Sequence, residues 1–175
     1  EGQEIALYLG LKMVANGSVA IFCGRKDTVS NLCEQAVDKF NRGLPLEAPS
    51  EFSNKDEVNK LYNLYEAHFG SQAIATQSAS LGIFSHHSNL PQGIRLAVEH
   101  AMRDDLIHFV ICTSTLAQGV NLPIRYLIVT SIYQGEEQIK RRDFHNLIGR
   151  AGRAGMYTEG SILFADPSVY DKKRD

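Results

Sequence analysis

Short apolar runs alternate along the chain with segments of helical spacing, and this alternation limits the folds available to it. The runs are residues 19–23, 82–84, 107–112, 126–132 and 161–165. Strands that are apolar on both faces are typical of parallel sheets covered by helices on both sides. Parallel neighbours need long, right-handed and usually helical crossovers. The sequence therefore predicts an α/β fold, a three-layer α/β/α sandwich with a mainly parallel sheet.

Helical periodicity marks the segments between these runs. Helices are predicted over residues 3–15, 27–40, 53–69, 91–103 and 136–149. Ser53 and Asp56 resemble a capping box at the start of the third helix. Residues 41–53 hold two prolines, a glycine and several polar residues, which predicts a loop. These helices fill the crossovers that a parallel sheet requires.

The composition favours one globular domain. A chain of 175 residues with 43% hydrophobic residues is long and apolar enough to form its own core, so we expect a single domain over residues 1–175. No apolar stretch approaches the roughly 18 residues of a membrane helix, and the first residues lack the pattern of a signal peptide. A cytoplasmic protein with no membrane partner is expected. Cys23, Cys33 and Cys112 lack C-x-x-C spacing, which argues against a disulfide framework or a zinc site.

Positive charge collects near the C-terminal end of the sequence, although the formal net charge is −2. The clustered residues are Lys140, Arg141, Arg142, Arg150 and Arg153. A local patch matters more for nucleic-acid binding than the sum of all charges. The first three of these residues are interpreted as an exposed helix face, with phosphate contact as the alternative.

The run GRAGRAG, residues 149–155, raises the possibility of a phosphate-binding loop. A P-loop requires G-x-x-x-x-G-K-[ST], and the sequence contains no Gly-Lys pair. Gly149, Gly152 and Gly155 also lack the spacing of the dinucleotide pattern G-x-G-x-x-G. Any phosphate bound by this run must therefore be contacted by arginine side chains.

Three segments, in their order and spacing, resemble motifs of one enzyme family. Val19–Val29 (VAIFCGRKDTV) resembles helicase motif IV, Thr113–Pro123 (TSTLAQGVNLP) resembles motif V, and Asn146–Gly155 (NLIGRAGRAG) resembles motif VI. The chain from about residue 19 to 165 is thus similar to the C-terminal RecA-like domain of superfamily 2 DExH/DEAD-box helicases. The wording of the last two motifs is closest to the Ski-like branch. Asn146 departs from the pattern, because many members carry Gln or His there.

The resemblance implies an ATP site divided between two domains. Arg150 and Arg153 would be arginine fingers that reach the γ-phosphate of ATP bound mainly by an N-terminal RecA-like domain, and Gly119 and Asn121 would lie near the nucleotide. Asp56-Glu57 follows a polar segment, so it is interpreted as a helix-start pair rather than the Mg²⁺-binding Walker B motif. ATP and Mg²⁺ would act in the full-length parent, and this fragment alone is predicted to be inactive.

The resemblance also implies a grip on single-stranded DNA or RNA. The residues that would contact the nucleic-acid backbone are Gly24, Arg25, Lys26, His87, Thr113 and Thr115. Hydroxyl, amide and cationic groups are the usual partners of phosphate oxygens. Thr113 and Thr115 also fit the role of ordinary strand-end residues. His86-His87 lacks a third ligand at suitable spacing, so no metal site is predicted.

Two functions remain open on the sequence alone. One is an ATP-driven helicase or translocase in which this domain completes the ATP site. The other is a non-catalytic RecA-like module that binds nucleic acid or a protein without turnover. The sequence does not distinguish DNA from RNA.

Overall fold

A central parallel sheet organises the computed structural model, which describes residues 2–118, 122–131, 133–134, 137–149 and 160–166. Within these residues five strands pair in the order β2-β3-β1-β4-β7, and every pairing among them is parallel. The strands are β1 (Val19–Phe22), β2 (Phe84–His86), β3 (Phe109–Cys112), β4 (Tyr126–Val129) and β7 (Ser161–Phe164). Each falls within or overlaps an apolar run, so the predicted strands are confirmed.

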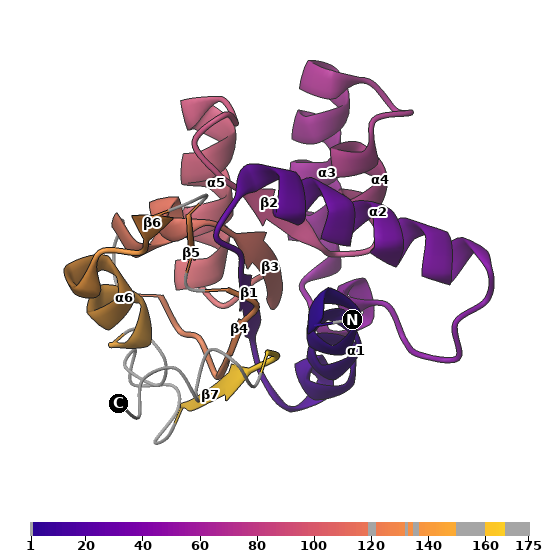
Figure 1. Ribbon diagram of the computed structural model, residues 1–175. Coiled ribbons are helices and arrows are strands. Elements are labelled where there is room, and N and C mark those ends of the chain that lie inside the picture. Colours follow the sequence, from indigo (N-terminus) through magenta and orange to yellow (C-terminus); the bar gives the residue numbers. More distant parts are fainter. Residues whose placement is uncertain (1, 119–121, 132, 135–136, 150–159, 167–175) are drawn as a thin grey trace.

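Helices cover both faces of the sheet. The helices are α1 (Gly2–Met13) and α2 (Lys26–Asn41) on one face, and α3 (Lys55–Phe69), α5 (Gln92–Arg103) and α6 (Arg141–Ile148) on the other. Strand residues alternate between the faces, so Val19 and Ile21 pack with α1 and α2, whereas Ala20 and Phe22 pack with the opposite helices. Figure 1 shows α1 and α6 on opposite sides of the sheet. The predicted three-layer α/β/α sandwich is confirmed.

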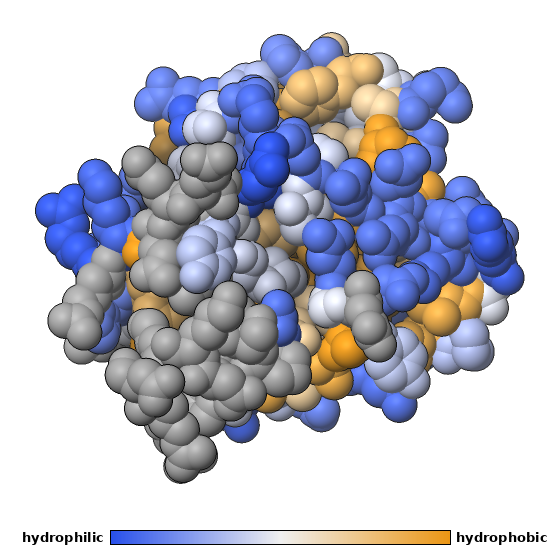
Figure 2. Space-filling view, viewed as in Figure 1, coloured by the Kyte–Doolittle hydropathy of each residue, from blue (hydrophilic) through white to orange (hydrophobic). Residues whose placement is uncertain are grey.

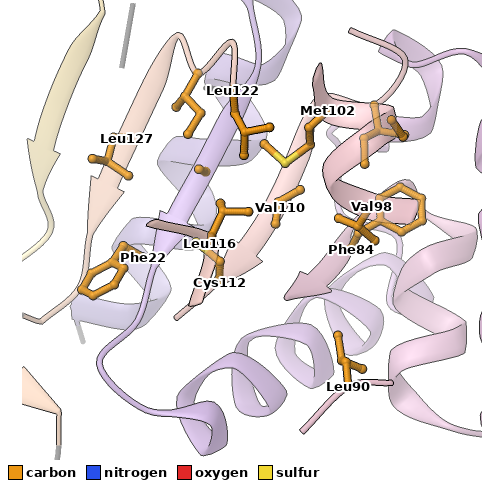
Figure 3. Close-up of a cluster of buried hydrophobic side chains, with 14 of the residues drawn as sticks. Phe22, Phe84, Leu90, Val98, Met102, Val110, Cys112, Leu116, Leu122 and Leu127 are labelled. Carbon is orange, nitrogen blue, oxygen red and sulfur yellow. The ribbon is translucent and has the colours of Figure 1, made fainter. Parts of the chain in front are cut away.

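The core between the sheet and α5 supports the ends of the central strands. In Figure 3, Val110 and Cys112 of β3 lie near Leu116 and Leu122, which belong to the chain beyond that strand. Val98 of α5 joins the same cluster, and all five side chains are completely buried. Because this core is apolar and closed, polar side chains that follow the strands must lie at its outer edge.

The start of α3 differs from the prediction. Asn54, not Ser53, is the N-cap, and its side-chain oxygen accepts a hydrogen bond from the backbone N–H of Glu57 at 3.0 Å. Ser53 instead donates its hydroxyl to the carbonyl of Pro49. The Asn54 N–H is also held by the carbonyl of Leu106 at 2.8 Å, so a long-range contact sets the cap position.

Two further elements differ from the sequence prediction. A short helix, α4 (Ile74–Ser80), precedes β2, where no helix was expected. The predicted helix over residues 136–149 begins only at Arg141, and the segment before it contributes β6 (Glu137–Gln138) to an antiparallel pair with β5 (Tyr133–Gln134). α4 has only 7 residues and β5 and β6 have 2 each, which is shorter than the stretches over which hydrophobic periodicity can be recognised.

The cysteines are structural. Cys23, Cys33 and Cys112 are all described, free and buried. Burial raises the pKa of Cys23 to about 12 and that of Cys33 to about 11, so both thiols stay protonated and unreactive. Among the described residues, no helix is long and apolar enough to cross a membrane.

We predict that Gly82→Ala destabilises the fold. Gly82 has a φ of +77°, and a Cβ atom there would lie 2.7 Å from Ser50 Cα and closer still to Ser50 N. Left-handed strain and the backbone clash together should lower the free energy of unfolding by at least about 2 kcal/mol. The measurement is urea unfolding followed by circular dichroism.

Gly93→Ala is the matched control for this substitution. Gly93 lies in α5, and a Cβ atom there would meet no other heavy atom within 4 Å. Alanine favours a helix over glycine by up to about 1 kcal/mol, so this variant should be as stable as wild type or slightly more stable. Equal effects at the two positions would contradict the steric argument.

Candidate functional site

Three strands end side by side at one edge of the sheet. Phe22 at the end of β1 is in register with Cys112 at the end of β3, which is in register with His86 at the end of β2. Hydrogen bonds continue one residue further, from Cys23 N to Cys112 O at 2.8 Å and from Thr113 N to His86 O at 3.1 Å. The three segments that follow these strands therefore begin next to one another, at the same edge of the sheet.

A cavity of about 340 Å³ opens between these segments. Its lining consists of Gly24, Arg25, Lys26 and Asp27 after β1, Ser88 after β2, and Thr113, Ser114 and Thr115 after β3. Figure 2 shows hydrophilic residues over the first turn of α2, the element that contributes Lys26 and Asp27 to the lining. The structure thus brings five of the six predicted backbone-contacting residues to one cavity, and His87 precedes Ser88 in the chain.

Cationic groups at the start of α2 face this cavity. Arg25 is the N-cap of α2 with extended backbone, and Lys26 is the first helical residue. Backbone N–H groups at a helix N-terminus carry partial positive charge and favour an anion. The Arg25 guanidinium lies 3.4 Å from the Asp27 carboxylate, but the side chains are 63% and 67% exposed. Such an exposed pair is weak, so Arg25 can exchange Asp27 for a phosphate oxygen.

Hydroxyl groups form the opposite wall of the cavity. The Oγ1 atoms of Thr113 and Thr115 lie 3.3 Å apart, at the start of the 3₁₀ helix η3 (Ser114–Gln118). Leu116 is completely buried in this turn, and its N–H donates to the carbonyl of Thr113. The buried leucine holds the turn in place, so the two hydroxyls stay directed to the cavity edge. A hydroxyl can donate to a phosphate oxygen.

The two adjacent histidines have different surroundings. His86 is completely buried on β2, and its Nε2 lies 2.8 Å from Glu99 Oε1 on α5. Burial lowers the pKa of His86 despite the carboxylate, so a neutral ring donates Nε2–H to Glu99. His87 is half-buried, and its Nδ1 accepts a hydrogen bond from the Asn89 N–H at 3.3 Å. Burial and nearby positive charge, including Lys26, lower the pKa of His87 too, so its free Nε2 carries the proton.

A larger cavity, of about 870 Å³, lies between α3 and α5. Leu61, Leu64, Leu96 and Ala97 give it a mainly apolar lining, with charged side chains such as Lys60 at its rim. It contains none of the residues that the sequence predicted for a site. The smaller cavity at the strand ends, where the predicted residues meet, is the candidate functional site.

Sequence comparisons identify the family. Residues 51–155 match the family described as "Helicase conserved C-terminal domain", and this segment is more than half of the chain. The chain belongs to the helicase C-terminal domain family. The α/β fold and the parallel sheet agree with this family, and the relatives place the domain with superfamily 2 helicases.

Several relatives are much longer proteins. The helicase domain is 33% identical over 153 residues to "Helicase POLQ-like" of Caenorhabditis elegans. The matched segment covers 87% of this chain and 16% of the relative. It is 35% identical over 155 residues to "Hachiman protein HamB" of Bacillus cereus, and this match covers 88% of this chain and 14% of the relative. It is 31% identical over 169 residues to "ATP-dependent DNA helicase Hel308" of Methanococcus vannielii, and this match covers 89% of this chain and 21% of the relative. The chain therefore spans about a fifth or less of the length of these relatives.

The residues predicted for the ATP site of this helicase domain, Gly119, Asn121, Arg150 and Arg153, lie outside the described residues. The described elements beside them are η3, which ends at Gln118, and α6, which ends at Ile148. These two elements pack against each other.

Sequence reasoning missed two polar residues of α5 near the site, Gln92 and Arg95. Both lie in the first turns of the helix that follows the histidines. Arg95 is four residues before Glu99, the partner of His86. Helical spacing alone could have placed Arg95 on the same face as Glu99 and thus near the strand ends.

We predict that His86 makes the fold less stable in acid. Its pKa lies below the ordinary value of 6.5 because the ring is buried. The folded state then binds fewer protons than the unfolded chain, so the stabilisation is complete above pH 6.5 and declines as pH falls below it. Urea unfolding of wild type and His86→Gln at about pH 7.5 and 5.5 measures this effect.

The expected result is a smaller loss of unfolding free energy on acidification in His86→Gln than in wild type. Glutamine retains an N–H donor for Glu99 but does not titrate. His68→Gln, an exposed position on α3, controls for the removal of a histidine as such. If wild type and His86→Gln lost the same unfolding free energy on acidification, the buried ring of His86 would not be the source of the acid sensitivity.

Proposed function

We propose that this chain, residues 1–175, is the second RecA-like domain of an ATP-dependent helicase or translocase, and that its strand-end cavity grips single-stranded nucleic acid. The observation that carries the proposal is the meeting of Gly24, Arg25 and Lys26 with Thr113 and Thr115 around one cavity. The family match supports the helicase assignment. Because one relative is named an ATP-dependent DNA helicase, DNA is the first substrate to test and RNA is the second.

The cavity residues suit a grip on the backbone rather than on the bases. Lys26 and Arg25 supply positive charge beside the N-terminal N–H groups of α2. Thr113 and Thr115 line the cavity and supply uncharged donors, and the neutral ring of His87, next to the lining residue Ser88 in the chain, would supply another. Phosphate oxygens accept from all of these groups, and such contacts carry no sequence information. Weak sequence preference is what a protein that moves along a strand requires.

We further propose that Arg150 and Arg153 are arginine fingers toward ATP held by a preceding RecA-like domain, with Gly119 and Asn121 near the nucleotide. A guanidinium offers a permanent charge and a planar fork of N–H donors that matches phosphate oxygens. Mg²⁺ would be held by that other domain, and the present domain alone would hydrolyse no ATP. We also propose that the domain belongs to the Ski-like branch and that the full-length protein is cytoplasmic.

The first test is ATP turnover by the full-length protein with and without single-stranded DNA. We expect Arg153→Ala to lower DNA-stimulated turnover by at least about a hundredfold, because an arginine finger stabilises charge at the transferring phosphoryl group. DNA binding should persist. Arg142→Ala is the control, because this α6 side chain is 86% exposed. Absence of turnover in wild type would favour a non-catalytic RecA-like module.

The second test addresses the cavity. We expect Lys26→Gln to weaken single-stranded DNA binding and to reduce the slope of log K against log salt by roughly 0.7, the value of one phosphate contact on a single strand. Lys39→Gln removes the same charge from the last turn of α2 and should leave the slope unchanged. Fluorescence anisotropy over a salt series measures both. Equal slopes in Lys26→Gln and wild type would exclude Lys26 from the contact surface.

A further inference from the structure

The larger cavity between α3 and α5, which we call the α3/α5 groove, leaves apolar side chains exposed. Leu96 of α5 is 55% exposed and Leu64 of α3 is 40% exposed, and both line the groove. Leu61, which is 1% exposed, and Ala97 continue this lining down to the core. Contiguous exposed apolar surface marks sites of interaction, whereas single exposed residues do not.

The groove has the shape of a seat for one helix. Its lining on α3 runs from Glu57 to Leu64, and its lining on α5 runs from Leu96 to Arg103. Each stretch covers two helical turns, so each wall is about 10 Å long. Grooves with apolar walls of this kind bind amphipathic helices, which insert apolar residues at positions i, i+3, i+4 and i+7.

The exposed charge around the groove is mainly positive. Lys60 is 76% exposed and Arg103 is 47% exposed. The two acids of the lining, Glu57 and Glu99, are more covered, with 14% and 16% exposed. Arg103 has Asp104 at 3.4 Å, but an exposed pair of this kind is weak and leaves the guanidinium available. A helix that matches the groove therefore carries Asp or Glu beside its apolar residues.

The lining suits a protein helix better than nucleic acid. Among its described residues there is no Phe, Tyr or Trp on which a base could stack. Its leucine and alanine side chains offer no hydrogen-bond donor to a phosphate. An apolar stripe flanked by charged residues is instead the ordinary pattern of an amphipathic helix.

The size of the groove favours a tethered helix over a separate protein. Ten described residues line the groove, whereas each side of a stable interface between separate proteins takes about 20–30 residues. A helix joined to the domain through the same polypeptide has a millimolar effective concentration, which populates a weak contact. This chain spans 21% or less of the three relatives above, so proteins of this family hold ample further chain.

We propose that the α3/α5 groove binds an acidic amphipathic helix from another part of the same full-length polypeptide. The apolar residues of this helix cover Leu64 and Leu96, and its carboxylates face Lys60 and Arg103. Burial of the two leucines stabilises the contact, and the charges select the partner and its orientation.

The groove shares one element with the strand-end cavity. Gln118 of η3 lines the groove, and Thr115 of the same 3₁₀ helix lines the strand-end cavity. The docked helix therefore contacts the element that supplies part of the hydroxyl wall of the candidate site. The inference goes beyond the proposed function and does not depend on nucleic-acid binding.

Cysteine labelling of the full-length protein tests whether the groove is covered. Leu96→Cys and Leu64→Cys each place a thiol on one wall, and Ser30→Cys, at an exposed position of α2, is the control. The native cysteines of the domain are buried, and burial raises their pKa, so they react slowly. We expect maleimide to label both groove thiols about tenfold more slowly than the control, each rate being divided by that of the urea-unfolded protein. Peptide mass spectrometry measures the label at each position.

Charge reversal at the rim tests the chemistry of the occupant. In the Leu96→Cys background, Lys60→Glu should speed labelling about threefold, because repulsion replaces an exposed ion pair. Lys55→Glu, on the same helix but outside the lining, should leave the rate unchanged. Both lysines are 76% exposed, so neither substitution should disturb folding.

A benzophenone maleimide attached to Leu96→Cys then identifies the occupant. Photocrosslinking should join the groove to a segment of the same polypeptide that bears Asp or Glu, and the product should have the mass of a monomer. A crosslink to a second polypeptide would overturn the tethered helix.

Other labelling results would also overturn the inference. If both groove thiols react as fast as the control, the groove is open, and if only one is protected, no helix lies between both walls. Protection that appears only at higher protein concentration indicates a second copy, and protection only with added oligodeoxythymidylate indicates nucleic acid. Protection that Lys60→Glu does not relieve excludes an acidic partner. The salt series with Lys26→Gln judges the proposed function separately from all of these results.

Discussion

The parallel pairing of β3 between β1 and β2 is the constraint on which the rest of the site depends. Each strand alone ends in a short polar segment with no evident relation to the others. The register aligns Phe22, Cys112 and His86, so residues that are about 90 positions apart in the sequence share one cavity. The apolar core beneath the strand ends excludes water from one side, and the polar side chains can then gather only on the other.

The charge at the strand ends is positive, whereas the formal net charge of the whole chain is negative. The chain carries a formal net charge of −2, yet Arg25 and Lys26 both line the strand-end cavity, where Asp27 offsets only part of their charge. Screening limits the effect of exposed charges to about 10 Å at ordinary salt, so distant acids do little to cancel this cluster. A small negative net charge is therefore compatible with a locally positive surface at the strand ends.

The sequence predicted the features that follow from repeated physical patterns and missed those that depend on single contacts. Apolar runs located all five strands of the sheet, and the order of motifs placed Lys26 and Thr113 near one edge. The Asn54 cap was missed because its N–H is held by Leu106, a contact across more than 50 residues. Arg95 was missed because attention stayed on the segments that follow the strands, although helical spacing sets Arg95 four residues before Glu99 on one face of α5.

The buried bond between His86 and Glu99 joins the edge strand β2 to the helix that carries Arg95. Four further α5 residues, Ile94, Val98, Ala101 and Met102, are buried in the same core. A close-packed core and a buried polar pair resist sliding of the helix along the sheet. The start of α5 is therefore held in a fixed place beside the ends of the sheet strands, by packing and a buried polar contact rather than by a loop.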